Sequence, residues 1–236
     1  VFWNRLYDPV LRERDDNAER ALRQRGLEVT TGNGSLLVEP WNLATRSGSP
    51  FRVFTPFWRV LQAQLEPSST LRTPALRTPA SWPDSLMLRD LDLLPRPNWA
   101  QGLADAWSPG EEGAAHRLSA FDSAQVSCYD DLRDVPGAEG TSRLSPHLAF
   151  GELSPRQVWS AALRCGDEAA AEPWLRQIGW REFAHHLLYH FPHTDVEPRR
   201  PEFARVPWRR SLSDLCAWQQ GKTGYPLVDA FMRQLW

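Results

Sequence analysis

The pattern of apolar and polar positions divides the chain into three stretches, of which residues 1–38 are the first. Three short runs are typical of extended structure: Val1–Trp3, Leu27–Thr30 and Ser35–Val38. Between the first two runs, Asp8 and Pro9 predict a helix start, because aspartate caps free amides and proline suits the first helical position. This helix is expected to run to Arg25 and to stop at Gly26. The stretch is therefore predicted to be an α/β piece.

Residues 39–105 form the second stretch, in which prolines recur. Leu71–Ala75 reads Leu-Arg-Thr-Pro-Ala, and Leu76–Ala80 repeats it immediately afterwards. Proline removes a backbone donor and disfavours helix in the residue before it, so such a segment is expected to be extended and solvent-facing. We therefore interpret residues 39–105 as a linker between two domains.

Residues 106–236 show helical spacing of apolar positions and no further strand signal. Ser145-Pro146 and Ser154-Pro155 each predict a helix start, because serine caps a free amide and proline follows it without losing a hydrogen bond. Further helices are predicted over residues 172–191, 211–220 and 226–236. The predicted fold class is thus an α/β piece, a linker and a predominantly all-α domain.

The composition is that of an ordinary globular protein, with 42% hydrophobic and 24% charged residues and a net charge of −2. A near-neutral chain has no overall basic field, so any DNA site must be a local patch. No apolar run approaches the roughly 20 residues that a membrane span needs. The three cysteines are too few and too scattered for a disulfide framework or a zinc site. We expect a cytoplasmic protein without a membrane segment or a bound metal.

Both ends of the sequence look cut. Val1 stands where a methionine would begin the chain, and helical spacing continues up to Trp236 without a capping signal. The chain is therefore expected to be a fragment that lacks both ends.

One segment predicts an anion site. Thr141, Ser142 and Arg143 precede the helix start at Ser145. The unpaired amides and the positive end of this helix's dipole point back towards these three residues. Hydroxyl groups and a guanidinium in that place suit a phosphate or a pyrophosphate. The alternative is an ordinary pair of capped helices, since serine followed by proline opens helices in many proteins.

The helix predicted to begin at Pro173 has two unlike faces. At about 100° per residue, Trp174, Gln177 and Arg181 fall on one side, with Trp180 at its flank. Indoles, an amide and a guanidinium can stack on flat rings, hydrogen-bond their edges and hold a phosphate. The alternative is a semi-buried aromatic face with a surface arginine. Hydrolase and metalloprotease signatures are missing, since no G-x-S-x-G and no H-E-x-x-H occurs.

Three motifs occur in order along the chain. They are Thr-Ser-Arg-Leu-Ser-Pro with a later Phe-Gly in Thr141–Gly151, Trp-Arg-Glu-Phe in Trp180–Phe183, and Gly-Lys-Thr-Gly-Tyr-Pro in Gly221–Pro226. Together they resemble the DNA photolyase/cryptochrome family. The resemblance implies that residues 1–38 end a Rossmann-like, antenna-binding α/β domain and that residues 106–236 are an incomplete helical FAD-binding domain. It also implies a monomer.

The resemblance assigns roles to single residues. FAD would be bound by Tyr129, Thr141, Ser142, Arg143, Leu144, Ser145 and Trp174. Damaged DNA would be bound by Arg133, Gln177, Trp180 and Arg181. Trp180 would stack against a flipped pyrimidine dimer, and Trp208 matches the outermost tryptophan of the chain that photoreduces the flavin. Trp180, Gln177 and Trp208 are therefore the predicted catalytic residues.

The implied activity is that of a deoxyribodipyrimidine photo-lyase, which splits cyclobutane pyrimidine dimers in UV-damaged DNA with an electron from photoexcited reduced FAD. Gln177 stands where such enzymes typically carry glutamate, and glutamine is common there in (6-4) photolyases. The alternatives are a (6-4) photolyase, a blue-light photoreceptor of the cryptochrome type, a flavin-free helical module that binds nucleic acid or protein, and an inactive fragment.

A second, antenna chromophore is implied near Trp3–Arg5 and Tyr7–Pro9. Some folate-binding members of the family carry an asparagine-glutamate pair just after this motif, where this sequence has Val10 and Leu11. The identity of the antenna is left open between a folate and a deazaflavin.

Overall fold

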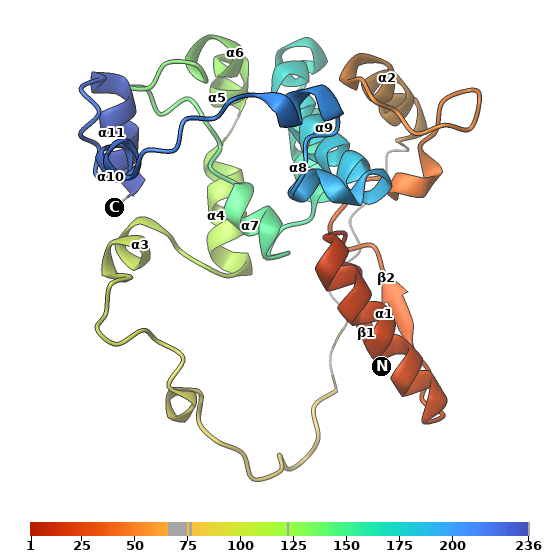
Figure 1. The fold of residues 1–236 in the computed structure, drawn as a ribbon. Helices are drawn as coiled ribbons and strands as arrows, with labels where there is room; N and C mark the ends of the chain where they lie inside the picture. The colour runs from red at the N-terminus through yellow and green to blue at the C-terminus, as the bar shows by residue number, and fades with distance from the viewer. Residues whose placement is uncertain (66–74, 76, 122, 236) are drawn as a thin grey trace. The chain divides into compact units, whose positions relative to one another are not determined.

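The structure is a computed structural model that describes residues 1–65, 75, 77–121 and 123–235. The chain divides into two compact units, residues 1–195 and residues 196–236, which we describe separately (Figure 1). Most of the first copy of the tandem repeat, residues 71–74, lies outside the described residues, as does Trp236.

The first unit begins with a small α/β piece (Figure 1). Strand β1, Phe2–Asn4, pairs in parallel with β2, Thr30–Gly32, and helix α1, Pro9–Gln24, connects them. The Asp8 side chain accepts the N–H groups of Val10 and Leu11 at 3.0 Å each, which confirms the predicted helix start. Gly26 has a φ of 79°, a left-handed conformation that ends the helix as predicted.

The extended run predicted at 35–38 pairs with no strand, because these residues form no ladder. Glu182 accepts the N–H groups of Leu37 and Val38 at 2.9 and 3.3 Å, and Arg156 donates to the Leu37 carbonyl at 2.6 Å. Distant side chains therefore satisfy the backbone groups that a neighbouring strand would otherwise have paired.

The prediction of an extended, solvent-facing linker is wrong for its first part. The 3₁₀ turn η1, Pro40–Asn42, and helix α2, Phe54–Gln64, fold there, and α2 buries the side chains Phe54, Phe57, Trp58 and Leu61. Apolar residues at these spacings form the face of an amphipathic helix, so proline content was the weaker signal. By contrast, residues 77–105 are almost entirely exposed, with only η2, Leu88–Leu91, and the start of α3, Gln101–Ala106, in regular structure.

The rest of the first unit is helical, and no described residue after β2 lies in a strand. Its elements are α4 Glu111–Ala120, α5 Ser123–Ser127, α6 Tyr129–Leu132, α7 Ser145–Ala149, α8 Pro155–Arg164, α9 Glu168–His190 and the 3₁₀ turn η3 Pro192–Asp195. Helix α9 is the longest, and α2, α5, α6 and α8 all pack on it. Gly179 permits the contact with α2, because a Cβ there would meet the Trp58 ring at 2.4 Å.

The two Ser-Pro pairs differ. Ser154 caps α8: its hydroxyl accepts the Gln157 N–H at 3.2 Å, and the Gln157 side chain accepts the Ser154 N–H at 2.7 Å. Ser145, in contrast, is not a cap, because Leu144 occupies the N-cap position of α7 without a side-chain cap bond. Arg143, with a φ of 51°, turns the chain so that the helix starts one residue earlier than predicted.

Helix α9 begins at Glu168 rather than at Pro173. Asp167 caps it by accepting the Ala170 N–H at 3.0 Å, and Pro173 is included in the helix. The cap and the alanines that follow it favour helix strongly enough for α9 to begin before Pro173 and to include it.

The second unit contains η4, Pro201–Arg205, α10, Leu212–Gln219, and α11, Pro226–Leu235. From α11, Asp229 accepts the N–H and hydroxyl of Thr223 at 2.8 and 2.6 Å and the N–H of Gly224 at 3.1 Å, both residues of the loop between the two helices. Among the described residues of the whole chain, no helix has the length and apolar character needed to cross a bilayer.

Candidate functional site

The first unit contains a cavity of about 490 Å³ between α9, the α6–α7 region and the start of α1, which we call the first cavity. Its lining residues are Leu6, Tyr7, Asp8, Leu11, Ser35, Tyr129, Ser142, Leu144, Ser145, Leu148, Ala149, Trp174, Gln177, Ile178, Arg181 and His185. Segments far apart in the sequence therefore converge on one space of ligand size.

Aromatic rings form one side of the first cavity. Trp174 is 2% exposed and Tyr129 is 7% exposed, and both contact the buried ring of Phe121, with centroid distances of 4.8 and 6.0 Å. Burial raises the pKa of the Tyr129 hydroxyl, although the charge of Arg133 opposes the shift. The rings are held by core packing, so their faces are fixed before any ligand arrives.

Polar groups of α9 also line the first cavity. The Arg181 guanidinium donates to the Ser35 carbonyl at 2.6 Å and lies 3.4 Å from a Glu182 carboxylate oxygen. Burial lowers the pKa of Arg181, while the Glu182 charge opposes that shift. Arginine has five donors, so Arg181 can hold Ser35 and still offer N–H groups to an anion in the cavity.

Glu182 of α9 links that helix to the segment at residues 37–38. Its side chain is almost fully buried and accepts the two N–H groups at positions 37 and 38. Burial raises the pKa of Glu182 to about 8, against the smaller opposing effect of Arg181. One turn further along α9, His186 accepts the Phe51 N–H at 3.0 Å, and burial lowers the pKa of this imidazole to about 4.

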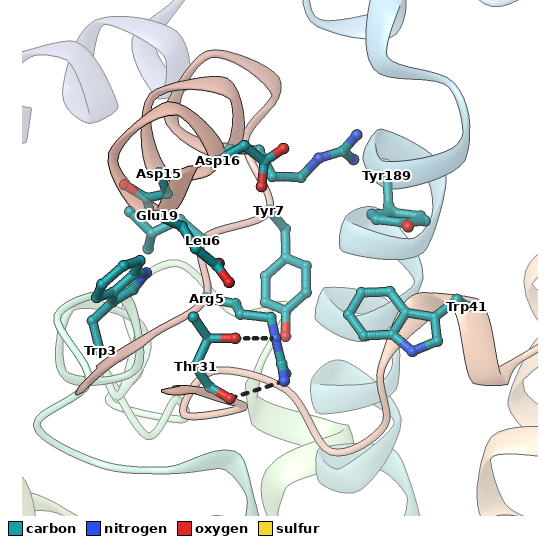
Figure 2. Close-up of a pocket in the computed structure, with 11 residues that line it drawn as sticks. Trp3, Arg5, Leu6, Tyr7, Asp15, Asp16, Glu19, Thr31, Trp41 and Tyr189 are labelled. Atoms are coloured by element: carbon teal, nitrogen blue, oxygen red, sulfur yellow. Dashed lines mark hydrogen bonds between the residues drawn. The ribbon is translucent and has the colours of Figure 1, made fainter. Parts of the chain in front are cut away.

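A second cavity, of about 300 Å³, lies between α1, the two strands and the end of α9 (Figure 2). It is lined by Trp3, Arg5, Leu6, Tyr7, Arg12, Asp15, Asp16, Glu19, Thr31, Trp41 and Tyr189. The Arg5 guanidinium donates to the Thr31 carbonyl and hydroxyl at 3.0 and 3.1 Å and pairs with Glu39. Leu6 and Tyr7 line both cavities, so they form the partition between them.

Comparison with known proteins identifies the family. The sequence model described as DNA photolyase matches residues 1–79, and the one described as the FAD binding domain of DNA photolyase matches residues 174–236. A deoxyribodipyrimidine photo-lyase of Agrobacterium fabrum is 43% identical over 241 residues, which cover 100% of this chain and 50% of that protein. The chain belongs to the DNA photolyase/cryptochrome family.

Both cryptochromes and photolyases are similar to this chain. Cryptochrome-2 of Arabidopsis thaliana is 34% identical over 252 residues, which cover 100% of this chain and 41% of that protein. A crystal structure of a bacterial class III photolyase from Agrobacterium tumefaciens superposes with a TM-score of 0.93 at 43% identity, covering 100% of this chain and 50% of that one. The chain spans about half the length of these photolyases, and the predicted fold class is confirmed.

The structure brings together most of the residues that photolyase resemblance assigns to FAD. Tyr129, Ser142, Leu144, Ser145 and Trp174 all line the first cavity. Thr141 and Arg143 do not line it: both are exposed, and the Arg143 guanidinium lies 2.8 Å from a Glu139 carboxylate oxygen. Helix α7 is short and Ser145 is not its cap, so the predicted helix-dipole contribution to anion binding is weak here.

The residues assigned to damaged DNA are spread more widely. Gln177 and Arg181 line the first cavity, but Trp180 does not. The Trp180 ring is 45% exposed and stacks on Phe54, with centroids 3.7 Å apart and an interplanar angle of 6°. Arg133 lies 3.4 and 3.7 Å from the carboxylates of Asp130 and Asp134. Trp208 belongs to the second unit, where its side chain is 81% exposed.

Sequence reasoning missed the N-terminal wall of the first cavity. Leu6, Tyr7 and Leu11 line it from the start of α1, and His185 from α9 meets Tyr7 edge to face at 6.0 Å. The resemblance placed Tyr7 near an antenna chromophore, but no local pattern places these residues against α9, because their contacts with that helix join residues more than a hundred positions apart. In the described residues, no group of three or more histidine, cysteine, aspartate or glutamate side chains could hold a metal ion.

Proposed function

We propose that this protein binds FAD in the first cavity and, under blue light, uses it to split cyclobutane pyrimidine dimers in UV-damaged DNA. The main support for this proposal is that five residues line one ligand-sized cavity: Tyr129, Ser142, Ser145, Trp174 and Gln177. These residues come from separate motifs, and the family's known members include photo-lyases that match the whole chain.

The chemistry of the cavity fits the proposed cofactor. Tyr129 and Trp174 offer fixed aromatic surfaces to a flat ring system, and the hydroxyls of Ser142 and Ser145 can donate to phosphate oxygens. When bound and reduced, FAD supplies an electron on absorbing blue light.

The chain's own residues would place the damaged base and the DNA backbone. Trp180 keeps one face against Phe54, so an extrahelical base would stack at the exposed side of its indole. Gln177 offers one acceptor and two donors to the edge of that base. Arg133 and Arg181 would contact phosphates, which requires Arg133 to exchange its carboxylate neighbours for the DNA backbone.

We also propose that an antenna chromophore occupies the second cavity. Trp3, Trp41 and Tyr189 give this cavity aromatic surfaces, and Arg5 and Arg12 give it donors. A folate and a deazaflavin are both flat heterocycles that such a lining accommodates. Absorption of the purified protein at wavelengths outside the flavin spectrum, abolished by Trp3→Ala, would support this part of the proposal.

The test of the main proposal is dimer loss from an irradiated oligonucleotide, measured with the protein made from its complete gene and with reduced flavin. We expect loss of cyclobutane dimers only under blue light, and roughly 5- to 150-fold slower loss in Trp180→Ala, because base stacking contributes roughly 1–3 kcal/mol. Trp82→Ala, which alters an exposed tryptophan in the proline-rich segment, is the matched control and should keep full activity.

Two specific observations define the rival functions. Gln177 favours a (6-4) photolyase, and the 34% identity to Cryptochrome-2 favours a photoreceptor. Bound, photoreducible flavin without loss of cyclobutane dimers would contradict our proposal and support one of these. A purified protein without any flavin would contradict all three and favour a helical module that binds nucleic acid or protein.

A further inference from the structure

We propose that Glu39 is a positioning residue for the FAD site, because it holds the Tyr7 ring that forms the N-terminal wall of the first cavity. This inference rests on the proposed function, since it takes the first cavity to be where FAD binds. It concerns residues of the α/β piece, which the motifs of the helical domain do not include.

The Tyr7 side chain is buried in the N-terminal wall of the first cavity. It is 4% exposed and lines both cavities, and its ring meets His185 of α9 edge to face. The Tyr7 hydroxyl donates to a Glu39 carboxylate oxygen at 2.6 Å. Burial and this hydrogen bond both raise the pKa of Tyr7, so the phenol keeps the proton that it donates.

Glu39 is itself held firmly. Its second carboxylate oxygen accepts from Arg5, whose remaining donors reach the carbonyl and hydroxyl of Thr31 in β2. The Arg5 guanidinium also lies 5.7 Å from the centroid of the Trp41 ring. Figure 2 shows Tyr7 beside Arg5 within the lining of the second cavity, with the two bonds from Arg5 to Thr31 as dashed lines. A chain of contacts thus runs from the sheet through Arg5 and Glu39 to the wall of the first cavity.

The alternative partners of Tyr7 are weak. Apart from Glu39, the one acceptor that the Tyr7 hydroxyl reaches among the described residues is the Asn33 side-chain oxygen, at 3.5 Å, which is a marginal hydrogen bond. Without Glu39, a buried phenol would lose its acceptor and gain by turning toward either cavity. Because the ring forms the partition, such a turn changes the shape of the first cavity.

The experiment measures FAD affinity and the visible circular dichroism of bound FAD, with the protein made from its complete gene. We expect Glu39→Ala and Tyr7→Phe each to weaken FAD binding about tenfold and to change the dichroism, because each removes a charge-assisted hydrogen bond. Glu39→Gln should recover most of the affinity, since its amide oxygen can accept from Tyr7. Glu13→Ala is the matched control, since Glu13 is an exposed acidic residue of α1 that lines neither cavity, and it should leave FAD affinity unchanged.

The double variant decides the mechanism. If Glu39 acts through Tyr7, the combined Tyr7→Phe and Glu39→Ala variant will bind FAD no more weakly than the weaker single variant. If the losses of FAD affinity in the two single variants multiply in the double variant, the inference is overturned. Unchanged affinity and dichroism in both single variants would overturn it as well. If Glu39→Ala does not fold, Tyr7→Phe and Glu39→Gln still test it through the dichroism. Failure of the unmodified protein to bind FAD would instead defeat the proposed function, before any variant is measured.

Discussion

The first cavity has two walls that are held in place by different forces. Helix α9 is fixed by apolar packing, in which Trp58 lies against Gly179 and Phe183 contacts the rings of α2. The N-terminal wall is fixed by hydrogen bonds of polar groups: Glu39 accepts from the Tyr7 hydroxyl, and in the segment that leads to Glu39, Glu182 accepts the N–H groups of Leu37 and Val38. Packing spreads its stabilisation over many contacts, whereas the polar wall depends on a few groups that are costly to leave unpaired. The two walls should therefore respond differently to substitution.

The largest effect is expected on the polar wall, at Glu182. Glu182→Ala leaves the buried N–H groups of Leu37 and Val38 without an acceptor, and each such loss costs roughly 1–3 kcal/mol. We expect unfolding in urea to show a loss of about 3 kcal/mol, with Glu182→Gln losing less because it keeps an acceptor. Glu13→Ala, at an exposed position of α1, is the control and should change stability by less than about 0.5 kcal/mol. Equal stability of Glu182→Ala and the unmodified protein would show that the wall is held otherwise.

The apolar wall is tested at Gly179. An alanine there would place its Cβ 2.4 Å from atoms of the Trp58 ring, so α2 or α9 must shift. Overpacking of this kind costs about 1–3 kcal/mol, which exceeds the gain in helix propensity. Gly102→Ala in α3 is the matched control, because nothing lies within 4 Å of its added Cβ. Gly102→Ala should leave thermal unfolding unchanged or raise its midpoint, and a similar rise in Gly179→Ala would contradict the packing argument.

The two walls also differ in their response to pH. Burial raises the pKa of Glu182 from its ordinary 4.5 to about 8, so within that window the folded protein holds a proton that the unfolded chain has released. Stability should therefore fall as pH rises through the window, by up to about 1.4 kcal/mol per pH unit. His186 acts in the opposite sense: its pKa is lowered from 6.5 to about 4, so stability should fall as pH decreases through that range.

The measurement is the midpoint of urea unfolding across pH 4 to 8, the range that these two pKa values bound. Between pH 4.5 and 6.5 the two slopes oppose each other, so Glu182→Gln should abolish the decline above pH 6.5 and expose the acidic decline below it. An alkaline decline that persists in Glu182→Gln would assign the titration to another group.

These walls also explain what the sequence could and could not predict. The periodicity of Trp174, Gln177 and Arg181 predicted one face of α9, because a long helix carries its geometry in its residue spacing. Tyr7 was singled out only by the family resemblance, as part of an antenna site, and its place against α9 could not be predicted, since contacts such as that of Ser35 with Arg181 join residues 146 positions apart. No local pattern records such contacts.

Trp180 shows the limit of the same argument. Its place at the flank of the helical face was predicted, but its stacking on Phe54 was not, because residues 39–65 were interpreted as a linker. The proline content of that stretch concealed a helix with a regular apolar face. Composition averaged over a long window is thus a weaker guide than spacing within a short one.

The smallest expected effect separates two motifs that look alike in the sequence. Ser154 caps α8 through a reciprocal pair of bonds with Gln157, whereas Ser145 makes no cap bond at α7. Ser154→Ala should therefore lose about 1 kcal/mol of unfolding free energy, and Ser145→Ala should lose almost none. Ser145 lines the first cavity, however, so Ser145→Ala should weaken FAD binding several-fold while Ser154→Ala leaves it unchanged. Urea unfolding and FAD titration of both variants, made in parallel, test this crossed pattern. If both serines affected stability alike, the Ser-Pro pairs would be equivalent caps and the hydroxyl of Ser145 would not be free for a ligand.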